Sequence, residues 1–452
     1  MFKISTLLVG MLWISINHAA TFTVGTGGTY DNIQAAINQA LMSSGSDEIR
    51  VGSGTYVENL NYFPTGSGKV LTISGGWNSL FDSQGDIPSV VDGDMTGPVL
   101  YVDIDSGDVL ILDNLKFQNG LANSGGGLDI SLIDDSSLMI SDCEIENNTA
   151  QNDRTTSGGM DVYAEDDASF TMVDSRIVGN QVICTGSVDC RAGGISLTGF
   201  GNTQVTFNRN EILNNSVTIG SGSAATGGAE FIIAGTSVLT IEDNHFIGNS
   251  ISGTTPFNGI GLSMSGSGTI TARRNYVEAN NASVPSPQFA TQLDISVSGD
   301  SSSILSDSVV VNSGTLGVRA GISGDGNPTL YLVNLTIADH MGAGIRLSKF
   351  SAGGQINLSN SISVNGNPNA EITAGTTESD NLLTGSAGFV NAAAGNYRLA
   401  VGSPAINAGN NAPLGGLGPT DIEGNPRIFN VTVDQGAYES QSMAFFADGF
   451  ED

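Results

Sequence analysis

Residues 227–249 read GGAEFIIAGTSVLTIEDNHFIGN, and they give the clearest indication of the fold. It holds three short runs of β-forming residues, at 229–232, 238–241 and 245–247, separated by turn residues. No run is long enough for a helix. Apolar residues two positions apart, such as Leu239 and Ile241, point to the same face of a strand. The stretch therefore predicts three consecutive strands that share one buried face.

The same unit recurs between residues 109 and 365, where it is marked by two columns of mostly asparagine residues. The two columns are five residues apart, and successive members of the second column are 26 to 35 residues apart. A period of this length without helix patterning indicates a β-solenoid. The first column is Asn114, Cys143, Ser175, Asn210, Asn244, Asn275, Asp307, Asn334 and Asn360. The second column is Asn119, Asn148, Asn180, Asn215, Asn249, Asn280, Asn312, Asp339 and Asn365.

Asparagine has a structural reason to recur at these turns. It tolerates the left-handed backbone conformation, and stacked side chains at the ~4.8 Å strand spacing can bond to one another. We therefore interpret the columns as structural turn ladders, with Asn210, Asn244, Asn275, Asn215, Asn249 and Asn280 as their clearest members. The units at Asn114, Asp307, Asn334 and Asn360 shift their inward residues by one position, which predicts a change in turn width.

These features resemble the right-handed parallel β-helix of pectate-lyase-like proteins. The glycine pair Gly227-Gly228 and the ending Phe246–Asn249 are also similar to the repeats of polymorphic outer membrane proteins. Residues 403–409, 421–427 and 433–439 resemble the domain found at the C-terminal end of many secreted β-helix proteins. The anchoring signals of those proteins vary from one member to another. The resemblance implies an all-β, right-handed parallel β-helix solenoid with an N-terminal capping helix. It does not imply an activity, because one fold hosts many functions.

The expected organisation has five parts. Residues 1–20 read as a signal peptide, since Lys3 precedes an apolar stretch too short to span a bilayer. Residues 21–70 form an N-terminal cap and first rung, with a helix that begins after Asp31. Residues 71–400 form the parallel β-helix, 401–440 the closing domain and 441–452 a tail. We expect no transmembrane helix.

Composition limits the partners. The chain has 452 residues, 39% apolar content and a net charge of −30. This charge argues against nucleic acid and anionic membrane surfaces, but it permits Ca²⁺. Cys184 and Cys190 bracket a short loop, so an exported chain should form a local disulfide there. The odd Cys143 is expected to be a buried small residue.

One candidate site lies one residue past the first column, at Glu144, Arg176, Glu211, His245 and Tyr276. Neighbouring coils would bring these side chains together. In a lyase or glycoside hydrolase, Glu211 would act as the acid/base, with Glu144, Arg176 and His245 assisting. Alternating charges on neighbouring strands also form an ordinary ladder worth ~0.2–1 kcal/mol per pair. We favour the ladder.

A second candidate site is acidic and follows the glycine pairs. Carboxylates facing one another without Lys or Arg can bind Ca²⁺, which takes six to eight oxygen ligands. The candidate ligands are Asp129, Asp134, Asp135, Asp161, Asp166 and Asp167. We favour solvated acidic loops here. No cofactor is required, and Ca²⁺ is possible.

The sequence lacks the signatures of several known β-helix enzymes. The polygalacturonase resemblance would require a His-Gly and an Arg-x-Lys motif, and neither occurs. We therefore favour a monomeric, secreted or cell-surface protein of the bacterial outer membrane or exterior. It would act as an adhesin or scaffold that binds glycans or other extended ligands. A polysaccharide lyase or glycoside hydrolase is the alternative.

Overall fold

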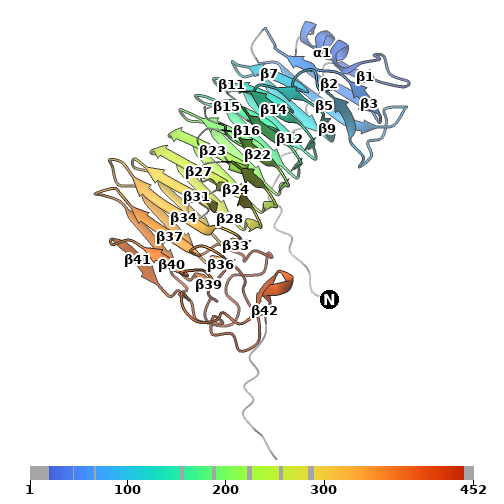
Figure 1. The fold of residues 1–452 in the computed structure, drawn as a ribbon. Helices are drawn as coiled ribbons and strands as arrows, with labels where there is room; N and C mark the ends of the chain where they lie inside the picture. The colour runs from blue at the N-terminus through green and yellow to red at the C-terminus, as the bar shows by residue number, and fades with distance from the viewer. Residues whose placement is uncertain are drawn as a thin grey trace, which may run out of the picture.

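The computed structural model describes residues 20–43, 45–65, 68–152, 157–185, 190–220, 226–253, 258–283 and 290–441. The expected signal peptide, apart from Ala20, and residues 442–452 of the expected tail lie outside these residues. The described chain is a stack of coils (Figure 1). Helix α1 (Ile33–Met42) lies at one end, and the C-terminal residues lie at the other.

Three long parallel sheets run the length of the stack, as the sequence predicted. Sheet A contains β1 (Ala20–Val24), β2 (Ser46–Gly52), β5 (Val70–Trp77), β8 (Val109–Asp113), β12 (Ser137–Ser141), β16 (Ser169–Val173), β20 (Gln204–Asn208), β24 (Val238–Glu242), β28 (Thr269–Arg273), β32 (Ser302–Ser306), β35 (Thr329–Val333), β38 (Gln355–Ser359) and β41 (Thr376–Ser379). Sheet C contains β4 (Leu60–Tyr62), β7 (Leu100–Ile104), β11 (Leu128–Leu132), β15 (Met160–Ala164), β19 (Ile195–Gly199), β23 (Thr226–Gly235), β27 (Asn258–Gly266), β31 (Thr291–Ser298), β34 (Leu316–Ser323), β37 (Ile345–Lys349) and β40 (Ala370–Ile372).

Sheet B carries the first candidate site. It contains β3 (Thr55–Val57), β6 (Ser89–Asp92), β9 (Leu115–Gln118), β13 (Glu144–Glu146), β17 (Arg176–Val178), β21 (Glu211–Leu213), β25 (His245–Ile247), β29 (Tyr276–Glu278), β33 (Val309–Ser313), β36 (Thr336–His340) and β39 (Ile362–Val364). One coil runs through sheets C, A and B in that order, as β19, β20 and β21 do. Each strand then pairs in parallel with its equivalent in the next coil.

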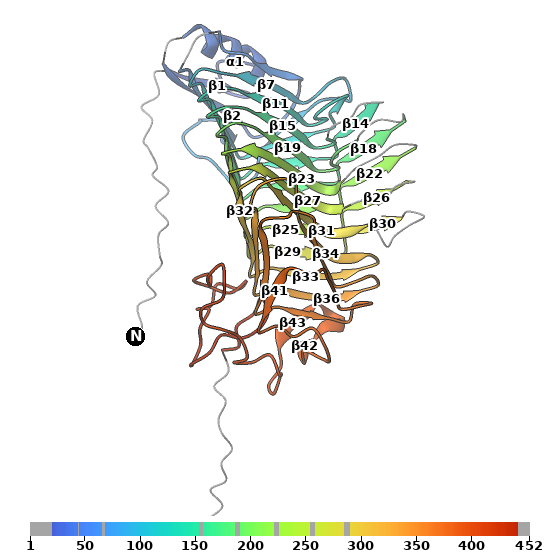
Figure 2. The same cartoon turned by 90° about the vertical axis from the view of Figure 1, so that its left-hand side faces the viewer.

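A fourth, shorter sheet was not predicted from the sequence. Sheet D contains β10 (Leu121–Ala122), β14 (Thr149–Asn152), β18 (Gln181–Cys184), β22 (Ser216–Ile219), β26 (Ser250–Ser252) and β30 (Asn281–Ser283). Figure 2 shows its strands in a row that projects on one side of the stack. Val182, Val217 and Ile251 form a small core of their own with the disulfide-bonded Cys184 and Cys190.

Inward-facing apolar side chains fill the space between the sheets. Phe207 of sheet A illustrates the packing, with its ring 5.2 Å from that of Phe231 and 6.5 Å from that of Phe246. All three are at most 1% exposed. Burying such a side chain stabilises the fold by about 1.5–3 kcal/mol. The alternating pattern of the sequence therefore produces one continuous core along the stack.

Helix α1 covers the first coil. Its N-cap is Asn32, whose side chain accepts a hydrogen bond from the Ala35 N–H at 2.8 Å. The sequence suggested Asp31 as the N-cap, which is one residue too early: Asn32 has the extended φ and ψ of an N-cap, and its side chain bonds the N–H three residues further along the chain. Glu58 accepts hydrogen bonds from the N–H groups of Ile33 and Gln34, which ties the helix to the stack. Among the described residues, no helix has the length and hydrophobicity to cross a bilayer.

The two asparagine columns form buried ladders in the middle coils. Asn215 Oδ1 accepts hydrogen bonds from both N and Nδ2 of Asn180, each at 3.0 Å, and Asn249 Oδ1 does the same for Asn215. The left-handed residue is the one before the ladder residue, for example Arg209 before Asn210 and Asn214 before Asn215. These asparagines therefore support the turns from inside.

The outer coils differ from the predicted columns by one residue. Register places Lys116 opposite Glu144, so Asn114 lies one residue before the position that matches Cys143. Asn114 itself has φ 51°, and the same left-handed geometry is found at Asp307, Asn334 and Asn360. Asparagine suits both the left-handed position and the inward ladder. An asparagine in the sequence therefore does not show which of these two positions it occupies. This explains why the inward residues of these units seemed to be shifted by one position.

The parallel sheets end at Ser379 of β41, whereas the sequence placed the boundary at 400. Residues 380–441, here called the closing segment, contain the antiparallel pair β42 (Phe389–Asn391) and β43 (Asn396–Leu399) and the 3-10 turn η2 (Ala392–Ala394). Apolar residues of this segment, including Tyr397, Ala405 and Ala437, pack against Val309 and Ile362 of sheet B. The closing segment therefore covers the outer face of the last coils of sheet B.

Candidate ligand-binding site

A polar column lies on the outer face of sheet B. Register pairs place Lys116, Glu144, Arg176, Glu211, His245 and Tyr276 on six successive strands, in that order. We call these residues the sheet-B strip. The structure thus brings together the four residues of the proposed catalytic set, which are consecutive members of the column.

Ion pairs link the first members of the strip. Arg176 Nε donates to Glu211 at 2.9 Å, and its guanidinium lies 3.5 Å from Glu144. The hydrogen bond to Glu211 is the main cause that raises the pKa of Arg176. Lys116 is bound to Glu146 and lies 3.6 Å from Glu144. This geometry is that of a cross-strand charge ladder.

The far end of the strip meets the closing segment. A cavity of about 210 Å³ lies there, which we call the junction cavity. Sheet B and the turns before its strands contribute Asp243, His245, Arg274 and Tyr276, and the closing segment contributes Ile422, Glu423 and Tyr438. Asp243 and Arg274 have left-handed backbones, at φ 60° and 52°, and occupy the turns between sheets A and B.

Charged groups around the junction cavity are held in place by one another. Arg274 donates to Asp243 at 2.7 Å and to Glu242 at 2.9 Å, and its hydrogen bond to Asp243 is the main cause of its raised pKa. Arg398 forms an ion pair with Glu423 and lies 5.9 Å from the centroid of the Tyr438 ring. Fixed donors and acceptors of this kind orient a polar ligand.

Two tyrosines supply aromatic surface. Burial raises the pKa of Tyr276, and burial together with nearby Glu423 raises the pKa of Tyr438 to about 12. Both phenols therefore stay protonated at neutral pH and can donate hydrogen bonds. The His245 ring contacts Tyr276 edge to face, with centroids 5.9 Å apart. The cavity thus combines aromatic faces with hydroxyl, carboxylate and guanidinium groups.

The six acidic residues proposed for Ca²⁺ separate into two sets. Asp129 and Asp161 lie opposite each other on sheet C, and burial, then the charge of Asp161, raises the pKa of Asp129 to about 7. The other four line an open groove of about 660 Å³ at the turns between sheets C and A: Asp134, Asp135, Asp166 and Asp167. Within the described parts of the chain, no group of three His, Cys, Asp or Glu side chains could hold a metal ion. The six residues therefore lie in two separate places, and Ca²⁺ binding by either set stays a prediction.

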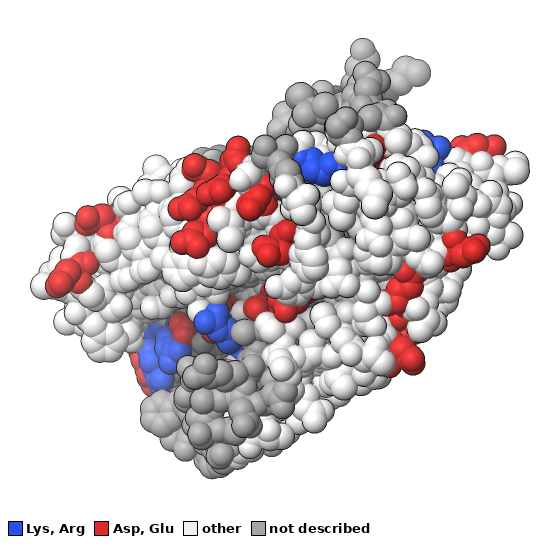
Figure 3. Space-filling model, turned by 90° about the horizontal axis from the view of Figure 1, so that it is seen from above, with Lys and Arg blue, Asp and Glu red and all other residues white. Residues whose placement is uncertain are grey.

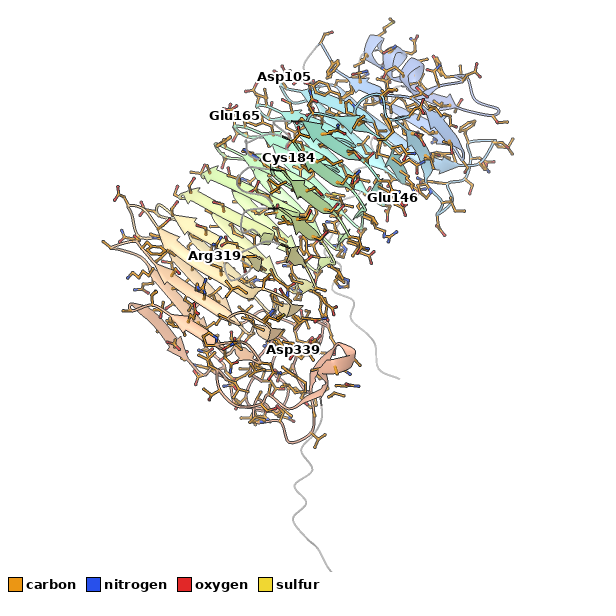
Figure 4. The ribbon with its side chains drawn as sticks, viewed as in Figure 1. Asp105, Glu146, Glu165, Cys184, Arg319 and Asp339 are labelled. Atoms are coloured by element: carbon orange, nitrogen blue, oxygen red, sulfur yellow. A yellow bond between two sulfur atoms is a disulfide. The ribbon has the colours of Figure 1, made fainter. Side chains whose placement is uncertain are left out.

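Figures 3 and 4 show how acidic groups are distributed. On the face seen in Figure 3, acidic side chains gather in several groups and basic side chains are few. In Figure 4, Asp105 and Glu165 lie along one edge of the stack and Glu146 lies on the other side. The edge that carries Asp105 and Glu165 is thus separate from sheet B, to which Glu146 belongs.

Sequence reasoning missed Glu423 and Tyr438, because they come from the closing segment and follow no repeat. Asp243 and Arg274 precede column asparagines, and their alternating charge was visible in the sequence. Cys184, the last residue of β18 in sheet D, forms a disulfide with Cys190, and Cys143 is free and buried.

Comparison with a family model supports the fold. Residues 100–283 match the family model described as right handed beta helix region. Among solved structures, the crystal structure of pectate lyase Pel9A is similar, with 12% sequence identity and a TM-score of 0.41. The similarity covers 94% of this chain and 97% of that one. A search of curated proteins found no significant match. The chain is therefore an all-β parallel β-solenoid, and residues 100–283 of it are similar to the right-handed β-helix family model.

Proposed function

We propose that this chain is a secreted or cell-surface β-helix protein that binds a glycan along the sheet-B strip, with the junction cavity as the specific pocket. The proposal rests on one observation, the junction cavity. Two tyrosines, a histidine, carboxylates and an arginine converge there from sheet B and the closing segment. The disulfide fits an oxidising exterior, where such bonds persist.

The chemistry of the cavity suits a sugar. The C–H face of a sugar ring packs against the aromatic faces of Tyr276 and Tyr438. Its hydroxyl groups are both donors and acceptors, so they can bond to Glu423, Asp243 and Arg274. These charged groups are already held by ion pairs, so little ordering is required on binding.

The alternative is a polysaccharide lyase or glycoside hydrolase that uses Glu211, Glu144, Arg176 and His245. A hydrolase of the usual kind requires two carboxyl groups flanking the bond to be cleaved, one of which protonates the leaving group. Here Arg176 lies between Glu144 and Glu211 and pairs with both. This arrangement supports binding rather than catalysis.

An array of neutral and acidic oligosaccharides tests the proposal, followed by calorimetry on the strongest ligand. We expect Tyr438→Ala and His245→Ala to weaken binding about tenfold or more, which corresponds to about 1.4 kcal/mol. Tyr163→Ala is the matched control, because Tyr163 is an exposed tyrosine on sheet C. No binding to any glycan, or equal losses in the control, would refute the proposal.

The enzyme alternative has its own readout. The strongest ligand is incubated with the protein, and new reducing ends and unsaturated products are measured. We expect neither product. Cleavage that disappears in Glu211→Gln would instead establish the enzyme.

A further inference from the structure

We infer that the junction cavity takes the end of a neutral glycan chain, not the middle of one. This inference rests on the proposed function and specifies which part of the ligand, and which class of glycan, the site accepts.

The closing segment blocks the strip beyond Tyr276. The same outward column continues into the next coils as Val309, Thr336 and Ile362, each at most 1% exposed. The Ala437 N–H donates to Thr336 Oγ1 at 2.9 Å. Gly436 lies so close to Ile362 that an added Cβ would be 2.7 Å from Ile362 Cδ1. A ligand that follows the column therefore meets a packed wall.

The other direction is open. The side chains of Arg176 and Glu211 are each 46% exposed, and His245 is also exposed. The strip continues across the strands of Glu211, Arg176, Glu144 and Lys116, at ~4.8 Å per strand. An extended chain therefore has surface to follow on one side of the cavity and a stop on the other.

The wall is held by two buried residues of the closing segment, Asp421 and Arg427. Asp421 is fully buried and accepts hydrogen bonds from the N–H groups of Glu423 at 2.9 Å and Glu439 at 3.0 Å. Arg427, also buried, lies 3.2 Å from Asp307 of the stack. These contacts fix the backbone on both sides of the cavity residues Glu423 and Tyr438. Asp421 and Arg427 thus position the wall.

Charge favours a neutral ligand. Arg274 is the only Lys or Arg among the described residues that line the cavity, and Asp243 and Glu242 pair with it. The neighbouring Arg398 is paired with Glu423. A uronate carboxylate would find no free arginine or lysine there and would face a chain of net charge −30. Neutral sugars carry no such penalty.

Length dependence tests the inference. The probes are β-1,3-glucan, β-1,4-mannan and β-1,4-xylan hexaoses, a much longer soluble polymer of each backbone, and oligogalacturonate. Calorimetry compares hexaose and polymer of the best-bound backbone at equal mass. If the cavity takes chain ends, the apparent Kd of the hexaose in mass concentration should be at least about tenfold lower than that of the polymer. The reason is that a given mass of hexaose contains more chain ends than the same mass of polymer. The inference also predicts no binding of oligogalacturonate.

Glu423→Gln tests the wall itself, with Glu378→Gln as control, because Glu378 is an exposed carboxylate on sheet A. We expect the first variant to weaken hexaose binding about tenfold and the second to leave it unchanged. Equal binding of hexaose and polymer by mass, or tight binding of oligogalacturonate, would overturn the inference but leave the proposed function intact. Failure of every glycan to bind would refute both.

Discussion

Arg176 joins Glu144 and Glu211 across three neighbouring coils, although the two glutamates are 67 residues apart in the sequence. The Arg176 and Glu211 side chains are each 46% exposed, so solvent screens their pair. We predict that Arg176→Ala lowers the free energy of unfolding by no more than about 1 kcal/mol. Urea denaturation measures this. A loss of several kcal/mol would mean that the strip is a structural element of the fold.

The buried ladder should respond much more strongly. Asn215→Ala removes the acceptor for N and Nδ2 of Asn180 and the donor to Ile177 O. Buried donors without partners cost about 1–3 kcal/mol each, so we expect a destabilisation of about 4 kcal/mol. Thermal and urea unfolding measure it.

Asn202→Ala is the matched control for the ladder. Asn202 is exposed and donates to Asp167 at 2.7 Å. Water replaces that bond, so the expected change is below about 0.5 kcal/mol. Similar losses in the two variants would contradict a stabilising role for the buried ladder.

The glycine pairs leave no room for a side chain. A Cβ on Gly194 would lie 2.5 Å from the Gly228 carbonyl oxygen of the next coil. We predict that Gly194→Ala destabilises the fold by about 3 kcal/mol, because the coils must move apart. On Gly85, the nearest atom would be 3.7 Å away, so Gly85→Ala should be nearly neutral. Differential scanning calorimetry distinguishes the two, and comparable melting shifts would be evidence against tight stacking.

His340 makes the stability depend on pH. Burial lowers its pKa to about 4, while a hydrogen bond to Val310 O and the charge of Asp339 act in the opposite direction. The unfolded chain takes up this proton near pH 6.5 and the folded chain only near pH 4. Stability from this group is therefore present above pH 6.5 and is lost as pH falls toward 4.

His340→Gln tests this contribution. Relative to the variant, we expect the unmodified protein to lose about 3 kcal/mol between pH 6.5 and 4, at 1.36 kcal/mol per pKa unit. Urea denaturation at several pH values measures the difference. Parallel pH profiles would show that His340 does not titrate in this way.

Much of the fold could be predicted from the sequence, because each coil stacks on the previous one with the same pattern of inward and outward residues. The inward pair Leu239 and Ile241 has the same spacing in every middle coil, and register pairs them with Val205 and Phe207. The strip residues His245 and Glu211 are opposite each other for the same reason. A periodic sequence determines which side chains become neighbours.

The rest could not be predicted, because it depends on contacts without a period. Ala437 binds Thr336 over a separation of 101 residues, and no repeat relates the two. The junction cavity depends on this docking, so its wall residues Glu423 and Tyr438 could not be assigned. Sheet D was missed because its strands are short and continue directly from ladder residues such as Asn215.

Above all, we expect the ligand to lie between sheet B and the closing segment. A crystal structure of the complete chain with the strongest array ligand tests it most directly. We predict a terminal sugar against Tyr276 and Tyr438, with the remaining sugars extending past His245 toward Glu211. A ligand bound on sheet C, on sheet D or along the acidic turns would contradict the account.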